Sequence, residues 1–418
     1  MKKQDNLKAM YRQIHPDLFP RNMEISFYDE QQRQTLFYEK VDWVIDGERK
    51  GLRYGENPDQ EAALYQLVNG NLCLGEVECI QSGRFLASQV ELLQSGKHPG
   101  KINITDADSA LSILRYFHET PCCVIVKHNN PCGVARDEDL ATAYHKAFMA
   151  DRIAAFGGVV ALNREVDGVT AELIAEQYCE VVVAPEFSAR ALELFSKKKN
   201  LRVMKIGNMN RLRDYVGRRV LDFKSLMDGG IIAQWSFAPR VLHATDFLRA
   251  ETVYRDQTYR MKREPTASEL DDLLFGWLVE AGITSNSVLY VKDGVTVGIG
   301  TGEQDRVGVA EIARDKAYRK LAERIAWERH QVPFAALSDT QKISEIEAEV
   351  ASVHGGLSGS AMISDGFFPF RDGVDVGIRE GVTAICQPGG SVRDYEVIQA
   401  CNENDVAMVF TGQRSFRH

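Results

Sequence analysis

Short apolar runs alternate with amphipathic stretches through the middle of the chain, from about residue 85 to 206. Leu111, Leu114 and Phe117 recur at helical spacing after Thr105, a good N-cap residue, and predict a helix there. The alternation continues with predicted strands at 122–126, 159–162 and 181–184 and predicted helices at 139–150 and 188–198. Continuous apolar strands between helices favour a largely parallel sheet that is covered on both faces.

The second half has the same style. Apolar runs at 288–291 and 295–299 flank Lys292-Asp293-Gly294, which predicts a β-hairpin. Residues 310–350 are rich in Arg, Lys and Glu and are typical of a solvated helical insertion outside the core. The remaining predicted elements are strands at 382–386 and 406–410, a helix at 394–402 and a C-terminal tail that its Arg, Phe and His residues predict to be docked. VIVKHNNPCG and TAICQPGGS are similar, which indicates either an ancient duplication or two similar strand–loop junctions.

Composition is that of an ordinary globular protein. The chain has 418 residues, of which 44% are hydrophobic and 26% charged, so two or three domains are expected. A net charge of −9 argues against a nucleic-acid partner. No apolar run approaches the roughly 18 residues of a membrane helix, and the N-terminus lacks the apolar stretch of a signal peptide. Eight cysteines without CxxC pairs favour a reducing compartment, so we expect a cytoplasmic protein with no membrane partner.

The segment VKHNNPCG, residues 126–133, carries the strongest chemical signal. It places an ammonium, Lys127, beside an imidazole, His128, directly after the apolar run 122–126. A buried strand followed by a Pro-Gly turn would hold both groups at the open end of the strand, where α/β sheets place ligands. A lone histidine near a core is more often a structural residue. The adjacent lysine shifts the interpretation toward an acid–base site, because an ammonium is rarely buried without a partner.

Other segments have both a structural and a functional interpretation. RYGENPDQ, residues 53–60, is either a solvated loop or an anion clamp in which Arg53 offers a planar fork to phosphate. The lysines at 197–199 either complement a helix dipole or contribute to a phosphate site. The aromatic run at 367–370 is either core or a platform for a planar ligand. GIGTG at 298–302 has the wrong spacing for a dinucleotide fingerprint, and the zinc-deaminase signature near His128 lacks its Glu and second Cys, so we expect no zinc.

Seven segments in a fixed order favour the functional interpretations. They are RYGENPDQ, VKHNNPCG, AAFGGVVALN, VVVAP with SKKKN, SNSVLYVKDG with VGIGTGEQDR, SDGFFPF and TGQRSFRH. Together they resemble AICAR transformylase, the formyltransferase half of the bifunctional purine-biosynthesis enzyme that also carries IMP cyclohydrolase. The resemblance runs from about residue 50 to the last residue. Because 52 residues precede Arg53, we expect a free-standing transformylase with a separate IMP cyclohydrolase, and residues 1–50 have no assigned role.

The resemblance implies an α/β fold of two cytidine-deaminase-like three-layer α/β/α units, at 51–225 and 226–418, with a helical insertion at about 310–355. It implies a homodimer that transfers the formyl group of 10-formyltetrahydrofolate to the 5-amino group of AICAR. His128 then matches the proton acceptor, Lys127 the stabiliser of developing charge and Asn286 the oxyanion donor. The residues that match AICAR-binding positions are Arg53, Tyr54, Gly157, Glu180, Lys199, Arg306, Arg414 and Phe416. The residues that match the folate pocket are Val307, Phe367, Pro369, Asp372, Ser391 and Val392.

Two positions depart from the family pattern. Asp59 stands where the RYGxNPHQ pattern has histidine, and Asp305 adds a carboxylate before Arg306, near the expected nucleotide site. Neither change touches the three catalytic positions, so activity is expected to survive. Two alternatives stay open. A hydrolytic or zinc-dependent enzyme on the same fold predicts activity without folate, and a non-catalytic purine-nucleotide-binding protein predicts AICAR binding without turnover.

Overall fold

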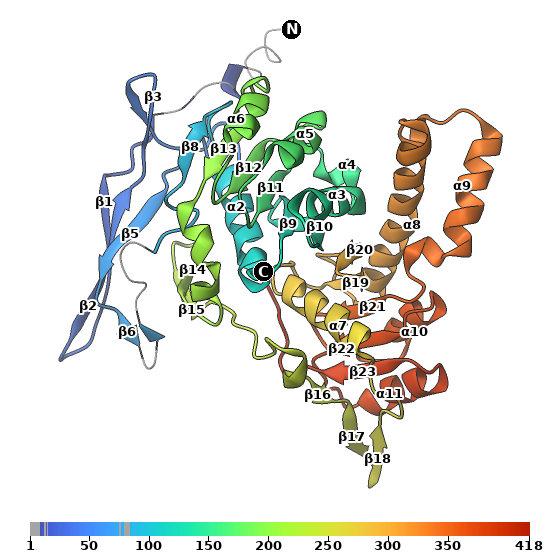
Figure 1. Cartoon of the computed structure of the whole chain (residues 1–418). Coiled ribbons are helices and arrows are strands. Elements are labelled where there is room, and N and C mark those ends of the chain that lie inside the picture. Colours follow the sequence, from blue (N-terminus) through green and yellow to red (C-terminus); the bar gives the residue numbers. More distant parts are fainter. Residues whose placement is uncertain (1–8, 12–13, 15, 75–76, 79–83) are drawn as a thin grey trace. The chain divides into compact units, whose positions relative to one another are not determined.

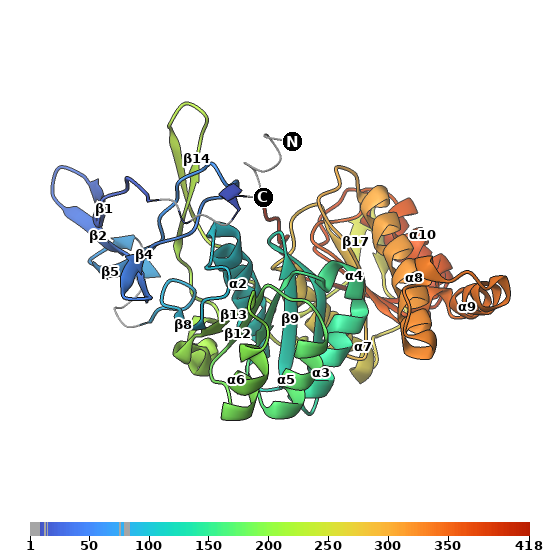
Figure 2. The same cartoon turned by 90° about the horizontal axis from the view of Figure 1, so that it is seen from above.

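A computed structural model describes residues 9–11, 14, 16–74, 77–78 and 84–418 of the chain. The chain divides into two compact units. Unit 1 comprises Met1–His118 and Gly157–Ala238, and unit 2 comprises Glu119–Phe156 and Pro239–His418. Both units are α/β structures (Figures 1 and 2), as predicted. Among the described residues, none of the helices combines the length and the apolar character that crossing a bilayer requires.

The core of unit 1 is a short sheet flanked by helices. β11 (Val159–Leu162), β12 (Val181–Ala184) and β13 (Arg202–Lys205) run parallel, and β8 (Glu91–Gln94) pairs antiparallel with β13. Every residue of β11 and β12 is buried, as their continuous apolar sequences predict. The helices of this core are α2 (Lys101–Leu114), which packs on β11, and α5 (Gly168–Glu176) and α6 (Ala189–Ser196), which lie side by side (Figure 2).

The start of α2 differs from its prediction. Its N-cap is Gly100, whose N–H donates to the side-chain Oδ1 of Asn103 at 3.0 Å. Thr105 lies inside the helix, where its hydroxyl donates to the carbonyl of Ile102 at 3.3 Å. The predicted N-cap at Thr105 is therefore wrong, because the side chain of Asn103 satisfies the helix start one turn earlier.

Residues that precede the core of unit 1 form small antiparallel structures. One three-stranded sheet has the order β1 (Asn22–Tyr28), β2 (Arg33–Lys40), β5 (Tyr65–Gly70). Phe27 of β1 stacks on Phe223 of the later strand β14 (Leu221–Ser225), with ring centroids 6.4 Å apart. The other short elements are β3 (Trp43–Ile45), β4 (Glu48–Lys50), β6 (Cys73–Leu74), β7 (Val77–Glu78), η1 (Arg115–Phe117), η2 (Gly207–Tyr215) and β15 (Ile231–Trp235), which pairs with β14.

Unit 2 contains a mixed sheet. Its strand order is β16-β23-β22-β21-β19-β20-β10-β9, where β21, β22 and β23 are parallel and the other neighbours antiparallel. The strands are β9 (Cys122–Lys127), β10 (Asn130–Arg136), β16 (Leu248–Arg249), β19 (Val288–Lys292), β20 (Val295–Gly300), β21 (Ala361–Ser364), β22 (Ala384–Gln387) and β23 (Ala407–Phe410). The antiparallel hairpin β19–β20 was predicted, whereas the antiparallel hairpin β9–β10 corrects the prediction of a largely parallel sheet.

Helices cover both faces of the unit 2 sheet. On β19 the Tyr290 hydroxyl donates to Ala310 of α8 (Arg306–His330), whereas the next side chain, Val291, meets Gly276 of α7 (Ala267–Glu280). Successive strand residues point to opposite faces, so α7 and α8 lie on opposite sides and form three layers. The other elements are α3 (Leu140–Ala150), α4 (Arg152–Ala155), α9 (Thr340–Ser352), α10 (Asp372–Arg379), α11 (Asp394–Glu403), η3 (Ala244–Asp246), η4 (Phe334–Ala336), η5 (His354–Gly356) and the hairpin β17 (Glu251–Tyr254)–β18 (Gln257–Arg260).

The polar stretch predicted to stay outside the core is α8 and α9, and half of that prediction is wrong. Val309, Ala310, Ala313 and Ala317, in the first half of α8, belong to the main core of unit 2. The second half of α8 instead packs on α9 through a small apolar cluster of its own that includes Leu321. Figure 1 shows the two helices side by side. Alanines form much of the buried face of α8, and they give only a weak hydrophobic pattern among the many charged residues of this helix.

One order of elements occurs twice along the chain. It begins with helix, strand, strand and helix, and it continues with three strands that are separated by two helices. It runs from α2 to β13 and again from α7 to β23, with α4 and α9 as additions. In each copy a glycine of the second strand allows close helix packing. A Cβ on Gly133 of β10 would lie 1.9 Å from the carbonyl oxygen of Ala147, and one on Gly298 of β20 would lie 2.3 Å from that of Ala313. The repeat favours duplication, but β9 corresponds by position to β19, not to β22 as the sequence similarity suggested.

Candidate functional site

The Lys127–His128 segment forms the tip of a β-hairpin. Lys127 ends β9 and pairs with Asn130, which begins β10, so the loop is the two residues His128 and Asn129. Their φ angles are 57° and 60°, in the left-handed region, as a type I′ turn requires. The predicted Pro-Gly turn is wrong, because residues 131–133 continue in β10 through an irregularity in the pairing register. Histidine is uncommon in this conformation, and such backbone strain concentrates at functional sites.

Beside this turn lies a cavity of about 280 Å³. Lys127 and His128 line it together with residues of β20, of the α3–α4 junction and of α8. The His128 side chain is exposed, whereas the Lys127 ammonium donates to the carbonyl of Phe156 at 2.8 Å. That contact fixes the ammonium at the cavity wall. The predicted acid–base pair therefore lies at the edge of a cavity that is partly open to solvent and that a small ligand can enter.

Three further charged side chains of this cavity were not predicted. Lys316 and Lys320 reach it from α8, and Asp151 reaches it from the residue between α3 and α4. Lys320 and Asp151 form an ion pair of 2.7 Å. Burial lowers the pKa of Lys316, and Lys320 adds to this effect while Asp151 opposes it. Together with Lys127, the two lysines of α8 give the cavity three ammonium groups against one carboxylate, so the cavity attracts anions.

Asn130 connects the turn with the segment that carries Asn286. Its side-chain Oδ1 accepts from the N–H of Thr284 at 2.9 Å and lies 3.2 Å from the hydroxyl of Thr301. The Thr301 hydroxyl lies 2.7 Å from the carbonyl of Thr284. One residue separates His128 from Asn130, and one separates Thr284 from Asn286. The structure thus brings the three predicted catalytic residues onto two segments that are hydrogen-bonded to each other.

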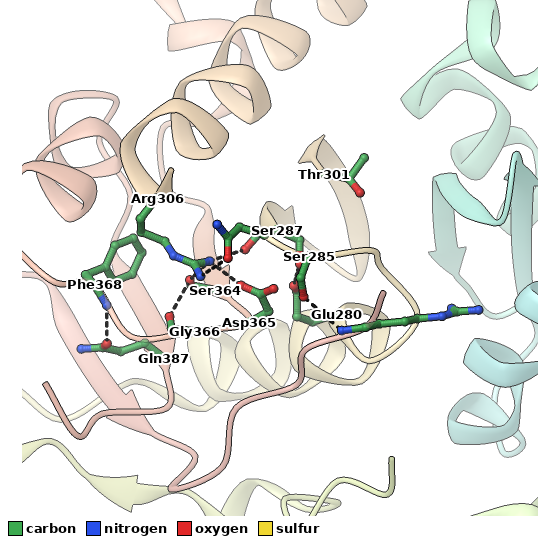
Figure 3. A network of polar contacts seen from close by, with 12 residues as sticks. Glu280, Ser285, Ser287, Thr301, Arg306, Ser364, Asp365, Gly366, Phe368 and Gln387 are labelled. Atoms are coloured by element: carbon green, nitrogen blue, oxygen red, sulfur yellow. Dashed lines mark hydrogen bonds and ion pairs between the residues drawn. The ribbon is translucent and has the colours of Figure 1, made fainter. Parts of the chain in front are cut away.

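Arg306 is the centre of a buried network beside Asn286 (Figure 3). Its Nη1 donates to the carbonyl of Ser287 at 3.1 Å, to the hydroxyl of Ser364 at 3.0 Å and to the carboxylate of Asp365. Its Nη2 donates to Oδ1 of Asn286 at 3.0 Å, and Nδ2 of Asn286 donates to the carbonyl of Gln304 at 3.0 Å. The amide of Asn286 is held at both ends. One N–H of its Nδ2 is not used by these contacts.

Asp305, whose carboxylate was expected near the nucleotide, is the N-cap of α8. Its Oδ1 accepts from the N–H of Gly308 at 2.6 Å. This contact gives the departure from the family pattern a structural role, because an N-cap carboxylate satisfies a free N–H and complements the helix dipole.

The two predicted folate segments are neighbours. The N–H of Phe368 donates to Oε1 of Gln387 at 3.0 Å, and Arg393 lies over the ring of Phe370 at 4.9 Å. Phe368 is fully buried, while Phe367 and Phe370 are about half exposed. The aromatic run is thus part core and part surface. Pro369, Asp372, Ser391 and Val392 lie on the same two segments, and Val307 lies in the first turn of α8.

The C-terminal tail is docked, as predicted. The N–H of Ser285 donates to the carbonyl of Arg417 at 2.9 Å, and Arg417 donates to the carbonyl of Gly282 at 2.7 Å. Arg414 stacks over the ring of Phe416 at 4.6 Å, and that ring lies against Gly366. Both predicted tail residues therefore lie on the same part of unit 2 as Arg306.

In unit 1 the structure gathers four predicted residues. The Nη2 of Arg53 donates to the hydroxyl of Tyr54 at 2.8 Å, and Gly157 donates its N–H to the carbonyl of Tyr178 at 2.8 Å. The carboxylate of Glu180 accepts from Asn103 at 3.2 Å and from the buried Arg202 at 3.3 Å. Burial raises the pKa of Tyr178, with Glu180 adding to the rise and Arg202 and Arg53 opposing it. The charges of Glu180, Arg202 and Arg53 therefore all act on the hydroxyl group of Tyr178.

Arg53 itself is less open than an anion clamp requires. It is buried, and its Nη1 donates to the carbonyls of Tyr11 and Lys97 at 3.2 and 3.1 Å. Lys199 lies in an exposed loop beside a cavity of about 110 Å³ that Tyr178 also lines. Asp59 is exposed, in the loop that Gly55 and Gln60 close by a backbone hydrogen bond of 2.8 Å.

A family described as AICARFT/IMPCHase bienzyme matches residues 21–316. The chain belongs to the AICARFT/IMPCHase bienzyme family. Its place is therefore among the enzymes of purine biosynthesis. The match begins at residue 21, so the resemblance starts earlier than the predicted residue 50. Residues 21–50 contain β1, β2, β3 and β4.

In this member of the AICARFT/IMPCHase family, the sequence did not predict the polar residues whose contacts join separate elements within each unit. They are His98, Asn103, Tyr178 and Arg202 in unit 1 and Asn130, Asp151, Glu280, Thr301, Lys316, Lys320 and Asp365 in unit 2. Only Asn130, Thr301 and Asp365 lie inside the seven segments that the sequence singled out. Across the described ranges, no three His, Cys, Asp or Glu side chains gather as a metal-binding group. Burial raises the pKa of the Cys132 thiol to about 12, so this cysteine of the cavity stays protonated.

Glu280 is a buried carboxyl group beneath the Arg306 network. It accepts a hydrogen bond from the Ser287 hydroxyl, and its other oxygen has no hydrogen-bond partner among the described residues (Figure 3). Burial raises its pKa well above the ordinary value of 4.5, and the nearby Asp365 adds to the rise, against weaker effects of Ser287 and Arg306. Burial therefore favours the neutral, protonated form of this carboxyl group in the folded protein.

This protonation predicts a pH-dependent effect of Glu280→Gln. Above pH 4.5 the unfolded chain ionises Glu280 while the folded protein keeps it protonated, so the stability of the wild-type protein falls as pH rises toward the raised pKa. Glutamine removes that loss. In urea unfolding between pH 5 and 8, the variant should gain stability relative to wild type with rising pH, by at most about 1.4 kcal/mol per pH unit. Glu347→Gln on the exposed face of α9 is the matched control, and an equal, pH-independent difference for both variants would contradict the assignment.

Proposed function

We propose that this protein transfers the formyl group of 10-formyltetrahydrofolate to the 5-amino group of AICAR, giving formyl-AICAR and tetrahydrofolate. Family membership supports a purine-biosynthesis enzyme that acts on AICAR. The observation that carries the finer assignment is the pair Lys127 and His128 at the strained turn, beside a cavity and hydrogen-bonded through Asn130 to the segment of Asn286. This arrangement suits acyl transfer, which needs a base, a cation and an oxyanion donor together.

The proposed reaction has an addition step and an elimination step. The amine nitrogen of AICAR attacks the formyl carbon, and His128 accepts the proton that the nitrogen loses. The free N–H of Asn286 donates to the oxyanion of the tetrahedral intermediate. The C–N bond to the folate nitrogen then breaks, and the ammonium of Lys127 favours departure of that nitrogen, which takes up the proton that His128 accepted. The AICAR amine needs this help because its lone pair is delocalised into the ring and the carboxamide.

Binding roles follow the matched positions. Lys199 and Arg414 would hold the phosphate of AICAR, with Arg53, Tyr54, Gly157, Glu180, Arg306 and Phe416 around the rest of the nucleotide. Val307, Phe367, Pro369, Asp372, Ser391 and Val392 would form the folate pocket, where the half-exposed Phe367 offers a face for a planar ring. The proposal also includes a homodimer, a separate IMP cyclohydrolase and, because the seven described cysteines are free thiols, a cytoplasmic location.

The test is a reaction of the purified protein with AICAR and 10-formyltetrahydrofolate. Tetrahydrofolate is followed by absorbance, and nucleotides are separated by chromatography. Tetrahydrofolate and formyl-AICAR should appear in equal amounts, without IMP. Consumption of AICAR when folate is omitted would favour the hydrolytic alternative, and AICAR binding by calorimetry without turnover would favour the non-catalytic one. Formation of IMP would show that the chain also closes the ring.

A further inference from the structure

A third cavity lies within unit 1 and has no part in the proposed reaction. It measures about 460 Å³, a size typical of small-molecule sites. Its walls come from β2, β5, α2 with η1, the end of η2 and the β14–β15 hairpin. The residues predicted to bind AICAR or folate are all described by the structure, and none of them lines this cavity. The cavity is therefore a candidate for a separate binding site.

Much of the cavity wall is apolar. Leu36, Leu72 and Leu111 line it and are buried, and the half-buried Trp235 adds an aromatic ring. A ligand that covers apolar surface of this kind is held by the hydrophobic effect, roughly in proportion to the area removed from water. The wall therefore favours a ligand with an apolar body.

The serine hydroxyls of the wall offer little to a polar ligand body. Three serines line the cavity, and two of their hydroxyls have partners within the protein. The Ser112 hydroxyl donates to the carbonyl of Ser109 at 2.7 Å, and the Ser236 hydroxyl accepts from the N–H of Val220 at 2.9 Å. The wall is therefore less suited to a ligand body with many hydrogen-bonding groups, which would lose water without replacing those bonds.

The charged part of the wall consists mainly of arginines. They are Arg84, Arg115, Arg218 and Arg219, and the one carboxylate of the lining is that of Asp108. Among the described residues, no carboxylate forms an ion pair with any of these four guanidinium groups. Arg115 donates to the hydroxyl of Tyr116 at 2.7 Å and Arg218 to the carbonyl of Asp214, which are both neutral groups. A cavity lined mainly by one sign of charge concentrates ligands of the other sign.

The arginines are more than solvated side chains that cover an apolar surface. An arginine often lays its stem on such a surface while its charge stays in water, and the exposed Arg219 fits that account. Arg115 does not. Its guanidinium lies over the ring of Tyr116 at 4.8 Å, and its Nε is buried without a hydrogen-bond partner among the described residues. A buried donor without a partner costs stability, and an anionic ligand would supply the missing acceptor.

Two of the arginines converge on one hydroxyl group, although they come from distant segments. Burial raises the pKa of Tyr215, which lines the cavity, and the positive charges of Arg84, Arg211 and Arg218 oppose the rise. Charges act in this way only over short distances in a salt solution. Arg84 and Arg218 therefore lie close enough together to bind the same anionic group.

We propose that this cavity binds an amphipathic organic anion, a molecule with an apolar body and a carboxylate or phosphate head group. The leucines and Trp235 would cover the body. Arg84, Arg115 and Arg218 would bind the head group, since a guanidinium forms charge-assisted hydrogen bonds with either kind of oxyanion. The lining belongs wholly to unit 1, whereas Lys127, His128 and Asn286 belong to unit 2, so this inference does not depend on the proposed formyl transfer.

The test is calorimetry of the full chain with octanoate and with octyl phosphate. At least one of them should bind once per chain, and the tighter ligand identifies the head group. Octanol has the same body without the charge, and acetate and inorganic phosphate have the head groups without the body, so these three probes should bind at least about 10-fold more weakly. Arg115→Gln and Arg218→Gln should each weaken binding of the anion by about 10-fold. Arg213→Gln, at an exposed residue of η2 outside the lining, is the matched control and should leave binding unchanged.

A second measurement places the ligand in this cavity. Binding should change the tryptophan fluorescence, and Trp235→Phe should remove that change while the anion still binds. Circular dichroism checks that each variant folds, and two arginine variants keep the test decisive if one of them does not. Binding of neither anion, equal affinity for octanol and octanoate, or unchanged affinity in both arginine variants would overturn the inference. Inorganic phosphate that binds as tightly as octyl phosphate would also overturn it, because the apolar wall would then have no role.

Discussion

Replacement of His128 by glycine is expected to lower kcat for formyl transfer by about 10²–10⁴-fold. That range is the usual contribution of a positioned general base, and no other imidazole lines the cavity beside Lys127. Glycine is the suitable replacement because His128 has a φ of 57°, where an alanine would add strain that glycine avoids. The variant should therefore fold as well as wild type, and circular dichroism and the urea midpoint check this. The rate is measured by formation of tetrahydrofolate.

Two controls separate loss of the base from damage to the turn. Asn129→Gly alters the other residue of the same turn, which also has a positive φ, and should keep activity within a few-fold of wild type. Added imidazole should restore part of the activity of His128→Gly, because free imidazole can enter the cavity that His128 lines and act there as the base. Full activity of His128→Gly would remove His128 from the mechanism. A loss that imidazole does not relieve, together with an equal loss in Asn129→Gly, would indicate a structural role.

The parts of the fold that were predicted correctly have strong local signals. β11 and β12 are four-residue apolar runs between helices, and each is fully buried. The Asp293-Gly294 turn has positive φ at both residues, as the sequence of the hairpin predicts. The helix at 139–150 is α3, and the side chain of its N-cap Asp139 accepts from the N–H of Thr142 at 2.8 Å. In each case the residues of one short segment are sufficient to predict the element.

β10 shows why the rest could not be predicted. Its residues Pro131, Cys132 and Gly133 have the composition of a turn, but Gly133 is required because the backbone of α3 passes within contact distance. Its actual turn residues, His128 and Asn129, include a histidine that few type I′ turns contain. A glycine that serves packing and a glycine that serves a turn look the same in a single sequence. Only the position of α3 distinguishes them.

The site residues also divide into those that a local segment predicts and those that depend on the fold. Lys127, His128 and Asn286 were found because each lies in a distinctive segment. Lys316, Lys320 and Asp151 were not, since the lysines resemble the other charges of a solvated helix, and a cavity gathers them from separate elements. The sequence also could not show that Arg306 is buried with Asp365, because 59 residues separate them. Contacts of that range depend on the fold.

The buried pair of Arg306 and Asp365 leads to the largest expected change in stability. Arg306→Met should destabilise unit 2 by about 3–5 kcal/mol, because it leaves the carboxylate of Asp365 in the interior without its cation. Asp365 is fully buried and one of its oxygens already has no partner among the described residues. Loss of Arg306 also removes the donors to Ser287 and Asn286. The measurement is the urea midpoint of the unfolding transition, followed by tryptophan fluorescence.

The double variant Arg306→Met with Asp365→Asn decides whether the uncompensated charge is the cause. Asparagine is similar in shape and neutral, so the double variant should recover a substantial part of the stability that Arg306→Met loses, while Asp365→Asn alone leaves a buried guanidinium and is also destabilising. Arg319→Met, an exposed residue on the same helix, is the matched control and should change stability by no more than about 0.5 kcal/mol. If the losses of the two single variants simply add in the double variant, the charges are not coupled. The cost of Arg306→Met would then come from lost packing and hydrogen bonds.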